Sequence, residues 1–216
     1  MLLLDKHYLH MRKSTYLWAL DAGHGGITRE GKYTTAPAKM HTFPDGKIVY
    51  EGLVNRDITE LLYKKLERAE IDFGLVYDEV EDTPLSQRVT TADNMFRKDK
   101  RTVYLSIHSN AGGGSGFEIF TSPGQSKSDK IANIFCEIYQ KHFPGFPFRA
   151  DKADGDADKE ADFYVLRKTD CPAVLVENLF FDNRKDADYL TSKEGKEAIA
   201  ECLYQCILAC EKLKPI

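Results

Sequence analysis

Four residues with the chemistry of a metallohydrolase occupy corresponding places in the sequence. His24 and His108 each stand at the end of an apolar run, and Glu177 ends a third such run. Glu51 opens a helical pattern between the two histidines. The carboxyl ends of the strands line the ligand-binding crevice of an open α/β sheet. The sequence therefore predicts that two imidazoles and two carboxylates meet at one edge of a sheet.

His24, Glu51 and His108 form a ligand set that suits catalytic zinc. Such a site takes three protein ligands and leaves a fourth position for water. Zinc lowers the pKa of that water to about 7, which supplies a nucleophile at neutral pH. Glu177 can then act as a general base that takes a proton from the water and passes it to a leaving amine. Together the four residues predict metal-assisted hydrolysis.

Each of these residues also has an ordinary structural explanation. A histidine after a strand can serve as a cap or fill a core, and Glu51 can be a first-turn carboxylate that the helix dipole favours. Glu177 can pair with an arginine such as Arg88 or Arg167. All of these explanations would have to hold at once, whereas one metal site accounts for the four residues together. We therefore favour the metal site.

The elements that position these residues alternate along the chain. Apolar periodicity predicts helices over 51–70, 84–98, 126–142 and 192–213. Short apolar runs predict strands over 16–21, 73–77, 102–107, 117–121, 163–166 and 173–176. Segments 27–50 and 144–162 are expected to be loops, the first with room for a short hairpin. This alternation predicts a single α/β sheet.

Composition and length narrow the class of protein. The chain has 216 residues, which suits one domain over 16–216 after an N-terminal extension, 1–15. A formal net charge of −4 argues against nucleic acid as a partner. No segment is apolar over the ~20 residues that a membrane span requires, and the N-terminus lacks the apolar core of a signal peptide. We expect synthesis in the cytoplasm without a signal peptide.

The cysteines, a Gly-rich segment and an acidic run do not indicate a different catalytic or metal site. The five cysteines contain no CxxC pair, and Cys202, Cys206 and Cys210 recur as a core-facing stripe of the last helix. The Gly-rich segment around Ser115 lacks the last glycine of a nucleophile elbow. The acidic run 151–162 has Lys159 where a calcium-binding loop needs glycine, so it is expected to be solvated.

These residues resemble the zinc-dependent N-acetylmuramoyl-L-alanine amidase family, which includes the catalytic domains of cell-separation amidases and phage endolysins. The resemblance covers about residues 16–213. Ala22 departs from a frequent proline, and Asn178-Leu179 replaces a small glycine after the glutamate. The matching motifs, in chain order, are Asp21-Ala22-Gly23-His24-Gly25-Gly26, Glu51 with Val54-Asn55, Leu85-Ser86-Gln87-Arg88 with Ala92-Asp93-Asn94, Ser106-Ile107-His108-Ser109-Asn110-Ala111, Gly116-Phe117-Glu118, and Pro172 to Glu177 with Phe180 and Asn183.

The resemblance implies a peptidoglycan hydrolase that acts at the cell wall. It implies Zn²⁺ held by His24, Glu51 and His108, with Glu177 as the catalytic glutamate. The bond cut would be the amide between N-acetylmuramic acid and L-alanine of the stem peptide. The implied fold is α/β, a single twisted, mainly parallel sheet with helices on both faces. We also expect Asn110 and Arg88 to bind substrate.

Two alternatives stay open on the sequence. A zinc carboxypeptidase or other peptidase could use the same ligands, and it would need an arginine to clamp a free substrate carboxylate. Arg88, Arg149 and Arg167 are candidates for that arginine. A wall-binding module without turnover would also keep the fold, although binding alone would not require Glu177. The sequence does not indicate an oligomeric state.

Overall fold

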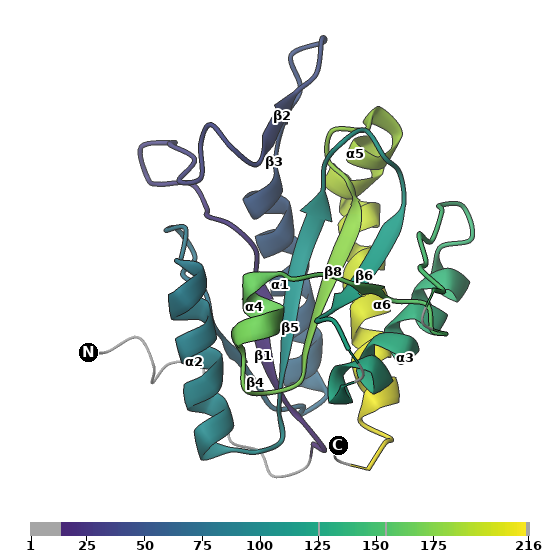
Figure 1. Cartoon of the computed structure of the whole chain (residues 1–216). Coiled ribbons are helices and arrows are strands. Elements are labelled where there is room, and N and C mark those ends of the chain that lie inside the picture. The colour runs from purple at the N-terminus through teal and green to yellow at the C-terminus, as the bar shows by residue number, and fades with distance from the viewer. Residues whose placement is uncertain (1–13, 125, 154, 215–216) are drawn as a thin grey trace.

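A mixed sheet of six strands forms the centre of the computed structural model, which describes residues 14–124, 126–153 and 155–214 (Figure 1). Of the expected N-terminal extension, residues 1–13 lie outside the described residues. The strand order is β4-β1-β5-β8-β6-β7. β4, β1, β5 and β8 run parallel, β6 runs antiparallel to β8, and β7 runs parallel to β6. The strands are β1 (Leu17–Ala22), β4 (Phe73–Leu75), β5 (Thr102–Asn110), β6 (Phe117–Thr121), β7 (Lys159–Glu160) and β8 (Ala173–Phe180).

Helices cover both faces of this sheet, as expected for the α/β class. α1, α3 and α6 pack with one apolar cluster, and α2 and α4 pack with a second cluster on the opposite face. A separate hairpin of β2 (Met40–Thr42) and β3 (Ile48–Tyr50) leads into α1. The helices are α1 (Glu51–Arg68), α2 (Leu85–Lys98), α3 (Lys127–His142), α4 (Tyr164–Lys168), α5 (Arg184–Thr191) and α6 (Lys193–Cys210).

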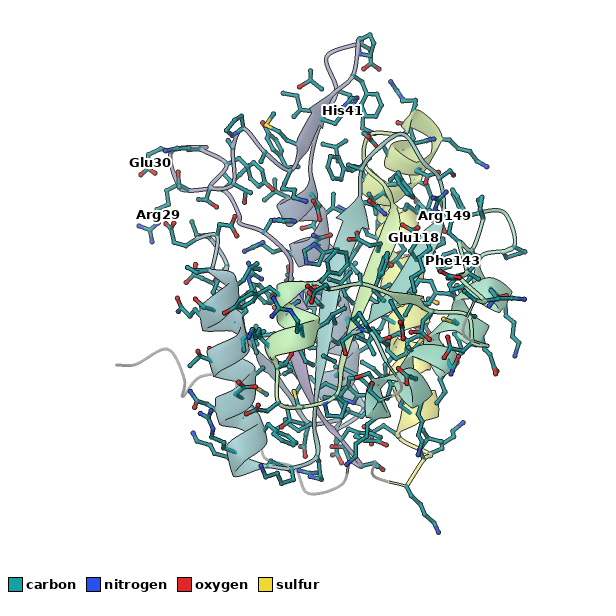
Figure 2. All side chains as sticks on the ribbon, viewed as in Figure 1. Arg29, Glu30, His41, Glu118, Phe143 and Arg149 are labelled. Carbon is teal, nitrogen blue, oxygen red and sulfur yellow. The ribbon has the colours of Figure 1, made fainter. Side chains whose placement is uncertain are left out.

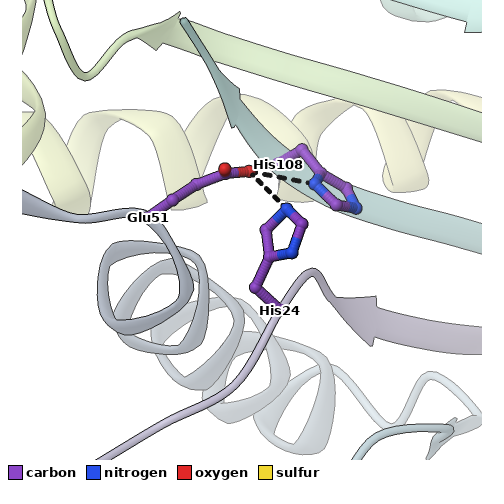
Figure 3. Close-up of side chains that lie close together, drawn as sticks. All are labelled: His24, Glu51 and His108. Atoms are coloured by element: carbon purple, nitrogen blue, oxygen red, sulfur yellow. Dashed lines mark hydrogen bonds and ion pairs between the residues drawn. The ribbon is translucent and has the colours of Figure 1, made fainter. Parts of the chain in front are cut away.

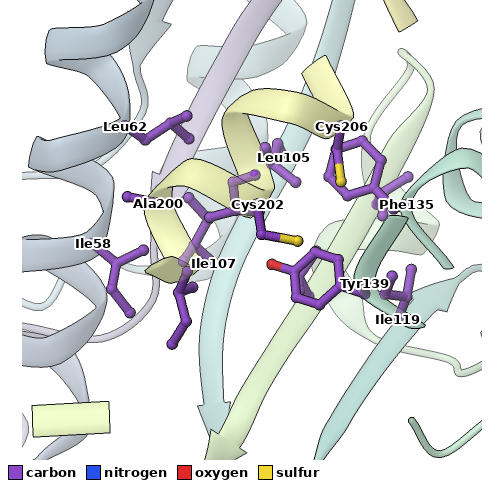
Figure 4. Packing of buried hydrophobic residues seen from close by; sticks show 14 of the residues in the cluster. Ile58, Leu62, Leu105, Ile107, Ile119, Phe135, Tyr139, Ala200, Cys202 and Cys206 are labelled. Carbon is purple, nitrogen blue, oxygen red and sulfur yellow. The ribbon is translucent and has the colours of Figure 1, made fainter. Parts of the chain in front are cut away.

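The main core lies between the sheet and the helices α1, α3 and α6 (Figure 4). Ile58 and Leu62 of α1 are fully buried against this core, and each such side chain contributes about 1.5–3 kcal/mol of burial free energy. The expected cysteine stripe is part of the same core: Cys202, Cys206 and Cys210 are buried free thiols. None of the helices in the described part of the chain is both long and apolar enough to cross a bilayer.

The structure corrects the expectation of a strand over 163–166. Phe163 is instead the extended residue before the short helix α4, in which Val165 and Leu166 pack towards α2. A short apolar run does not by itself distinguish a buried strand from a buried helical turn, so the pattern was ambiguous there. The expected loop over 144–162 contains the two-residue strand β7, and the helix α5 was not predicted at all.

The strands that carry the site residues are longer than expected. β5 continues past Ile107 to Asn110, and β8 continues past Val176 to Phe180. His108 and Glu177 therefore lie within strands, where they pair in register with each other. The backbone ladder fixes their positions more firmly than a loop would.

Candidate metal centre

The turn after β1 brings His24 to the carboxyl edge of the sheet. Gly23 is required here, because a Cβ at this position would lie 2.1 Å from Cε1 of His108. His24 itself has φ of 67°, in the left-handed region that non-glycine residues seldom adopt. This strained turn places the imidazole of His24 against that of His108, with 4.9 Å between the ring centroids and 86° between the planes.

Glu51 is the first residue of α1, and its position is fixed by the preceding loop. Its backbone N–H donates to the carbonyl of Lys39, and the next amide, of Gly52, donates to the hydroxyl of Tyr33. These bonds satisfy backbone donors that a helix start otherwise leaves unpaired. The Glu51 side chain, only 1% exposed, points from the helix start to the two histidines (Figure 3).

Glu51 and the two histidines form one close cluster. Oε1 of Glu51 lies 3.2 Å from Nε2 of His24 and 3.0 Å from Nδ1 of His108. One ligand atom from each of the three residues lies within 4.8 Å of the others. The predicted ligands are therefore brought together from β5, α1 and the turn after β1, although they are far apart in the sequence.

The unsatisfied atoms of this cluster fit a bound cation. Oε2 of Glu51 is buried and has no hydrogen-bond partner among the described residues, and the nearest cation, Nζ of Lys39, lies 3.9 Å from it. Within the described part of the chain, the buried Nε2 of His24 faces only the Glu51 carboxylate, at 3.2 Å. Buried polar atoms are seldom left without a partner, and such atoms call for an explanation. Two imidazoles and one carboxylate are a donor set of catalytic zinc sites. The residues present thus fit a metal ion and could hold one.

The charges of the cluster also favour a cation. Burial alone would raise the pKa of Glu51, but the hydrogen bonds and charges of His108 and His24 hold it well below its ordinary value. Burial lowers the pKa of His24. Burial would lower the pKa of His108 too, but the adjacent Glu51 and Glu177 carboxylates raise it above its usual value. The two carboxylates therefore stabilise positive charge between them.

Glu177 lies beside His108 on the neighbouring strand. The two residues are register partners of β8 and β5, so their side chains leave the same face of the sheet. Oε2 of Glu177 is buried and has no hydrogen-bond partner among the described residues. Burial, reinforced by Glu51 and opposed by His108, raises the pKa of Glu177 to about 8. A carboxyl group with this pKa exchanges a proton readily near neutral pH.

Arg88 takes a different place from the one expected of a substrate-binding residue. The residue is 1% exposed, and its guanidinium group is enclosed behind the His24 turn. It forms an ion pair with Asp21 and donates to the carbonyls of Ala22, at 2.8 Å, and His24, at 2.9 Å. The hydroxyl of Tyr104 also donates to Asp21. Arg88 therefore holds the turn that carries His24, and no open face of the guanidinium points to a substrate.

Sequence reasoning missed several side chains that support the cluster. Asn55 donates to the carbonyl of Gly23 and accepts a hydrogen bond from the hydroxyl of Ser109. Asn178 donates to the carbonyl of His108. Asn55, Ser109 and Asn178 stood within or beside the motifs, but nothing local in the sequence indicated which backbone groups they reach. Asn110, an expected substrate-binding residue, is half-buried, and its amide donates to Glu118.

The chain is similar in sequence to a curated amidase and a curated endolysin. The chain is 30% identical over 183 residues to the N-acetylmuramoyl-L-alanine amidase CwlM of Bacillus licheniformis, covering 84% of this chain and 63% of that protein. It is 31% identical over 199 residues to the endolysin of Bacillus phage SPP1, covering 87% of this chain and 63% of that protein. The chain thus spans somewhat less than two thirds of the length of these curated relatives.

Solved structures share the fold. The N-acetylmuramoyl-L-alanine amidase AmiC2 of Nostoc punctiforme superposes with a TM-score of 0.71 at 24% identity, covering 91% of this chain and 97% of that one. An N-acetylmuramoyl-L-alanine amidase from Clostridium difficile 630 gives a TM-score of 0.73 at 22% identity, covering 90% and 95%. The family model described as N-acetylmuramoyl-L-alanine amidase matches residues 19–209. That match spans both histidines, Glu51 and Glu177, and the chain therefore belongs to the N-acetylmuramoyl-L-alanine amidase family.

Proposed function

We propose that this chain hydrolyses the amide bond between the lactyl group of N-acetylmuramic acid and L-alanine of the peptidoglycan stem peptide. It would act at the cell wall, where that substrate lies. The observation that carries the proposal is the His24–Glu51–His108 cluster with Glu177 as the register partner of His108, in a chain of the amidase family. The two curated relatives with an amidase or endolysin name support it.

Zinc is the proposed metal, and His24, Glu51 and His108 would hold it. When bound there, zinc supplies Lewis acidity that activates water and polarises the scissile carbonyl. The ligands come from one helix start, one strand and one glycine turn, so the metal would be held by elements that pack on the same core. The buried network of Asp21 and Arg88 would keep the His24 turn in place.

Glu177 is the proposed general base. Its unpartnered Oε2 is free to accept a proton from the attacking water and later to deliver it to the amine of the departing L-alanine. A pKa near 8 favours the protonated form at neutral pH, and an added positive charge at the three ligands would lower that pKa. Glu177 would then be ionised when it must accept a proton and would release it readily afterwards.

Digestion of purified peptidoglycan tests this function. We expect the zinc-loaded chain to release new free amino groups of L-alanine, and we expect a chelator or Glu177→Gln to abolish that release. New reducing sugar ends would indicate a glycosidase and contradict the proposal. Release of C-terminal D-alanine would indicate a carboxypeptidase, and binding to the wall without any new ends would indicate a binding module.

A further inference from the structure

Two cations share one buried carboxylate next to the candidate site. Glu118 of β6 is 3% exposed, and its Oε1 accepts from Nε of Arg149 at 2.9 Å and from Nζ of Lys159 at 2.6 Å. Figure 2 shows Glu118 and Arg149 together at one side of the sheet. Either cation alone would neutralise Glu118, so the trio keeps one positive charge in excess.

The sheet register places this trio in line with the metal ligands. Glu118 of β6 is the register partner of Glu177, and Glu177 is the partner of His108. Partners on neighbouring strands project from the same face. Strands lie about 4.8 Å apart, so Glu118 lies about 10 Å across the sheet from His108, with Glu177 between them. The cations therefore lie on the side of Glu177 that is remote from His108.

The guanidinium group of Arg149 is held in place, and two of its nitrogens remain available to a ligand. Its Cζ lies 5.3 Å from the centroid of the Phe180 ring, and its Nε is bound to Glu118. Nη1 and Nη2 have no hydrogen-bond partner among the residues that the structure describes, and the side chain is 44% exposed. A guanidinium fork fixed in this way matches the two oxygens of a carboxylate. Lys159, 27% exposed, adds a second positive charge beside it.

We propose that Arg149 and Lys159, positioned by Glu118, form a subsite for a carboxylate of the stem peptide. This inference rests on the proposed function, in which the scissile amide would lie beside the three proposed ligands and Glu177. Glu118 lies about 5 Å from Glu177 and about 10 Å from His108, and an extended peptide spans at most about 3.5 Å per residue, so the subsite would receive a group about two residue lengths from that amide. The residue after L-alanine in a stem peptide is a γ-linked glutamate, whose α-carboxyl is either free or amidated. The free carboxylate is the ligand that this subsite would select.

Two muramyl peptides that differ only at this carboxyl group test the subsite. We expect the wild-type chain to cleave the free-carboxylate peptide with a kcat/KM about tenfold above that of the amidated peptide, as a charge-assisted hydrogen bond would give. Arg149→Met should remove this preference, mainly by raising the KM of the free-carboxylate peptide towards that of the amidated peptide. A wild-type chain that treats both peptides alike, or an Arg149→Met variant that slows both equally, would overturn the proposal.

Arg184→Met is the matched control. Arg184 is 52% exposed, donates from Nε to Asp188 at 2.8 Å and lies 5.4 Å from the ring centroid of Phe43. Like Arg149 it binds a carboxylate through Nε and lies over an aromatic ring, and its Nη1 also pairs with Asp45. Because it lies on α5, this variant should keep the wild-type preference. Arg149→Lys retains the charge and the fold contacts without the fork. We expect it to lose most of the preference, and it serves as the test if Arg149→Met does not fold.

Binding of a product-like probe separates this inference from the proposed cleavage. The dipeptide L-alanyl-γ-D-glutamate carries the carboxylate but no scissile bond, and its binding to the wild-type chain can be followed by NMR chemical-shift titration. If neither muramyl peptide is cleaved, the proposed function is wrong. Dipeptide binding that weakens about tenfold in Arg149→Met would still support the subsite. Dipeptide binding that does not depend on Arg149, or no binding, would refute it.

Discussion

Gly23→Ala should disable the metal centre through one added methyl group. An ideal Cβ at position 23 would lie 2.1 Å from Cε1 and 2.4 Å from both ring nitrogens of His108. Ordinary contact begins at 3.4 Å, so the ring would have to retreat by about 1.3 Å. Metal–ligand distances vary by only about 0.2 Å. We expect zinc affinity to fall at least about 100-fold, a loss of about 2.8 kcal/mol of binding free energy.

A competition titration with a chromophoric chelator measures this affinity, and thermal unfolding with and without zinc gives a second reading. The zinc-dependent rise in melting temperature should shrink in Gly23→Ala, since stabilisation by a ligand depends on its affinity. Gly145→Ala is the matched control, because a Cβ there would meet nothing within 4 Å. Wild-type zinc affinity in Gly23→Ala would show that contact between residue 23 and the ring does not position His108.

Three further predictions concern the ligands, the buried ion pair and pH. His108→Ala should lose zinc and activity together. Glu177→Gln should keep zinc but lose at least about 100-fold in kcat. Metal analysis that shows full zinc occupancy in His108→Ala would contradict this prediction. Arg88→Met leaves Asp21 buried without its cation, so the free energy of unfolding measured with urea should fall by about 3–5 kcal/mol. A fall of less than about 1 kcal/mol would refute the stabilising role of the ion pair. Burial would raise the pKa of Asp21, but Arg88 and the hydroxyl of Tyr104 hold it below its ordinary 3.8. The unfolded chain therefore binds this proton first as pH falls, so unfolding free energy should drop from about pH 4 downwards, and Asp21→Asn should show a shallower drop.

The two histidines, Glu51 and Glu177 could be singled out in the sequence because each stands at the start or end of a recognisable local pattern. His108 and Glu177 come directly after apolar runs, which is where the prediction ended their strands. Ladder hydrogen bonds join backbone groups, and they do not require apolar side chains. The strands β5 and β8 therefore continue through His108 and Glu177. Local polarity therefore ended the predicted strands too early, at Ile107 and Val176.

The role of Arg88 could not be predicted from local patterns, because its ion-pair partner is distant in the sequence. Its charge suggested a contact with substrate, yet its partner Asp21 stands 67 positions earlier and is itself buried. Only the packing of α2 against β1 reveals that the two charges neutralise each other.

Leu179 is a second residue whose role the local pattern did not predict. It stands where the family resemblance suggested a small glycine, and it is fully buried with φ of 63°. Its left-handed backbone is a conformation that glycine adopts without steric cost.

The alternation of side chains along β8 places its valines in the main core and Glu177 at the candidate site. Val174 and Val176 face the core shared with α1, α3 and α6, whereas Leu175 faces the opposite cluster. The same alternation directs Glu177 away from the main core and towards the face where His108 and Glu118 project. A slip of one residue would turn every side chain of β8 to the other face. It would move Val174 and Val176 out of the main core and direct the carboxylate of Glu177 into that core. The apolar residues that stabilise the sheet therefore also favour the face of β8 on which the proposed base lies beside the proposed metal ligands.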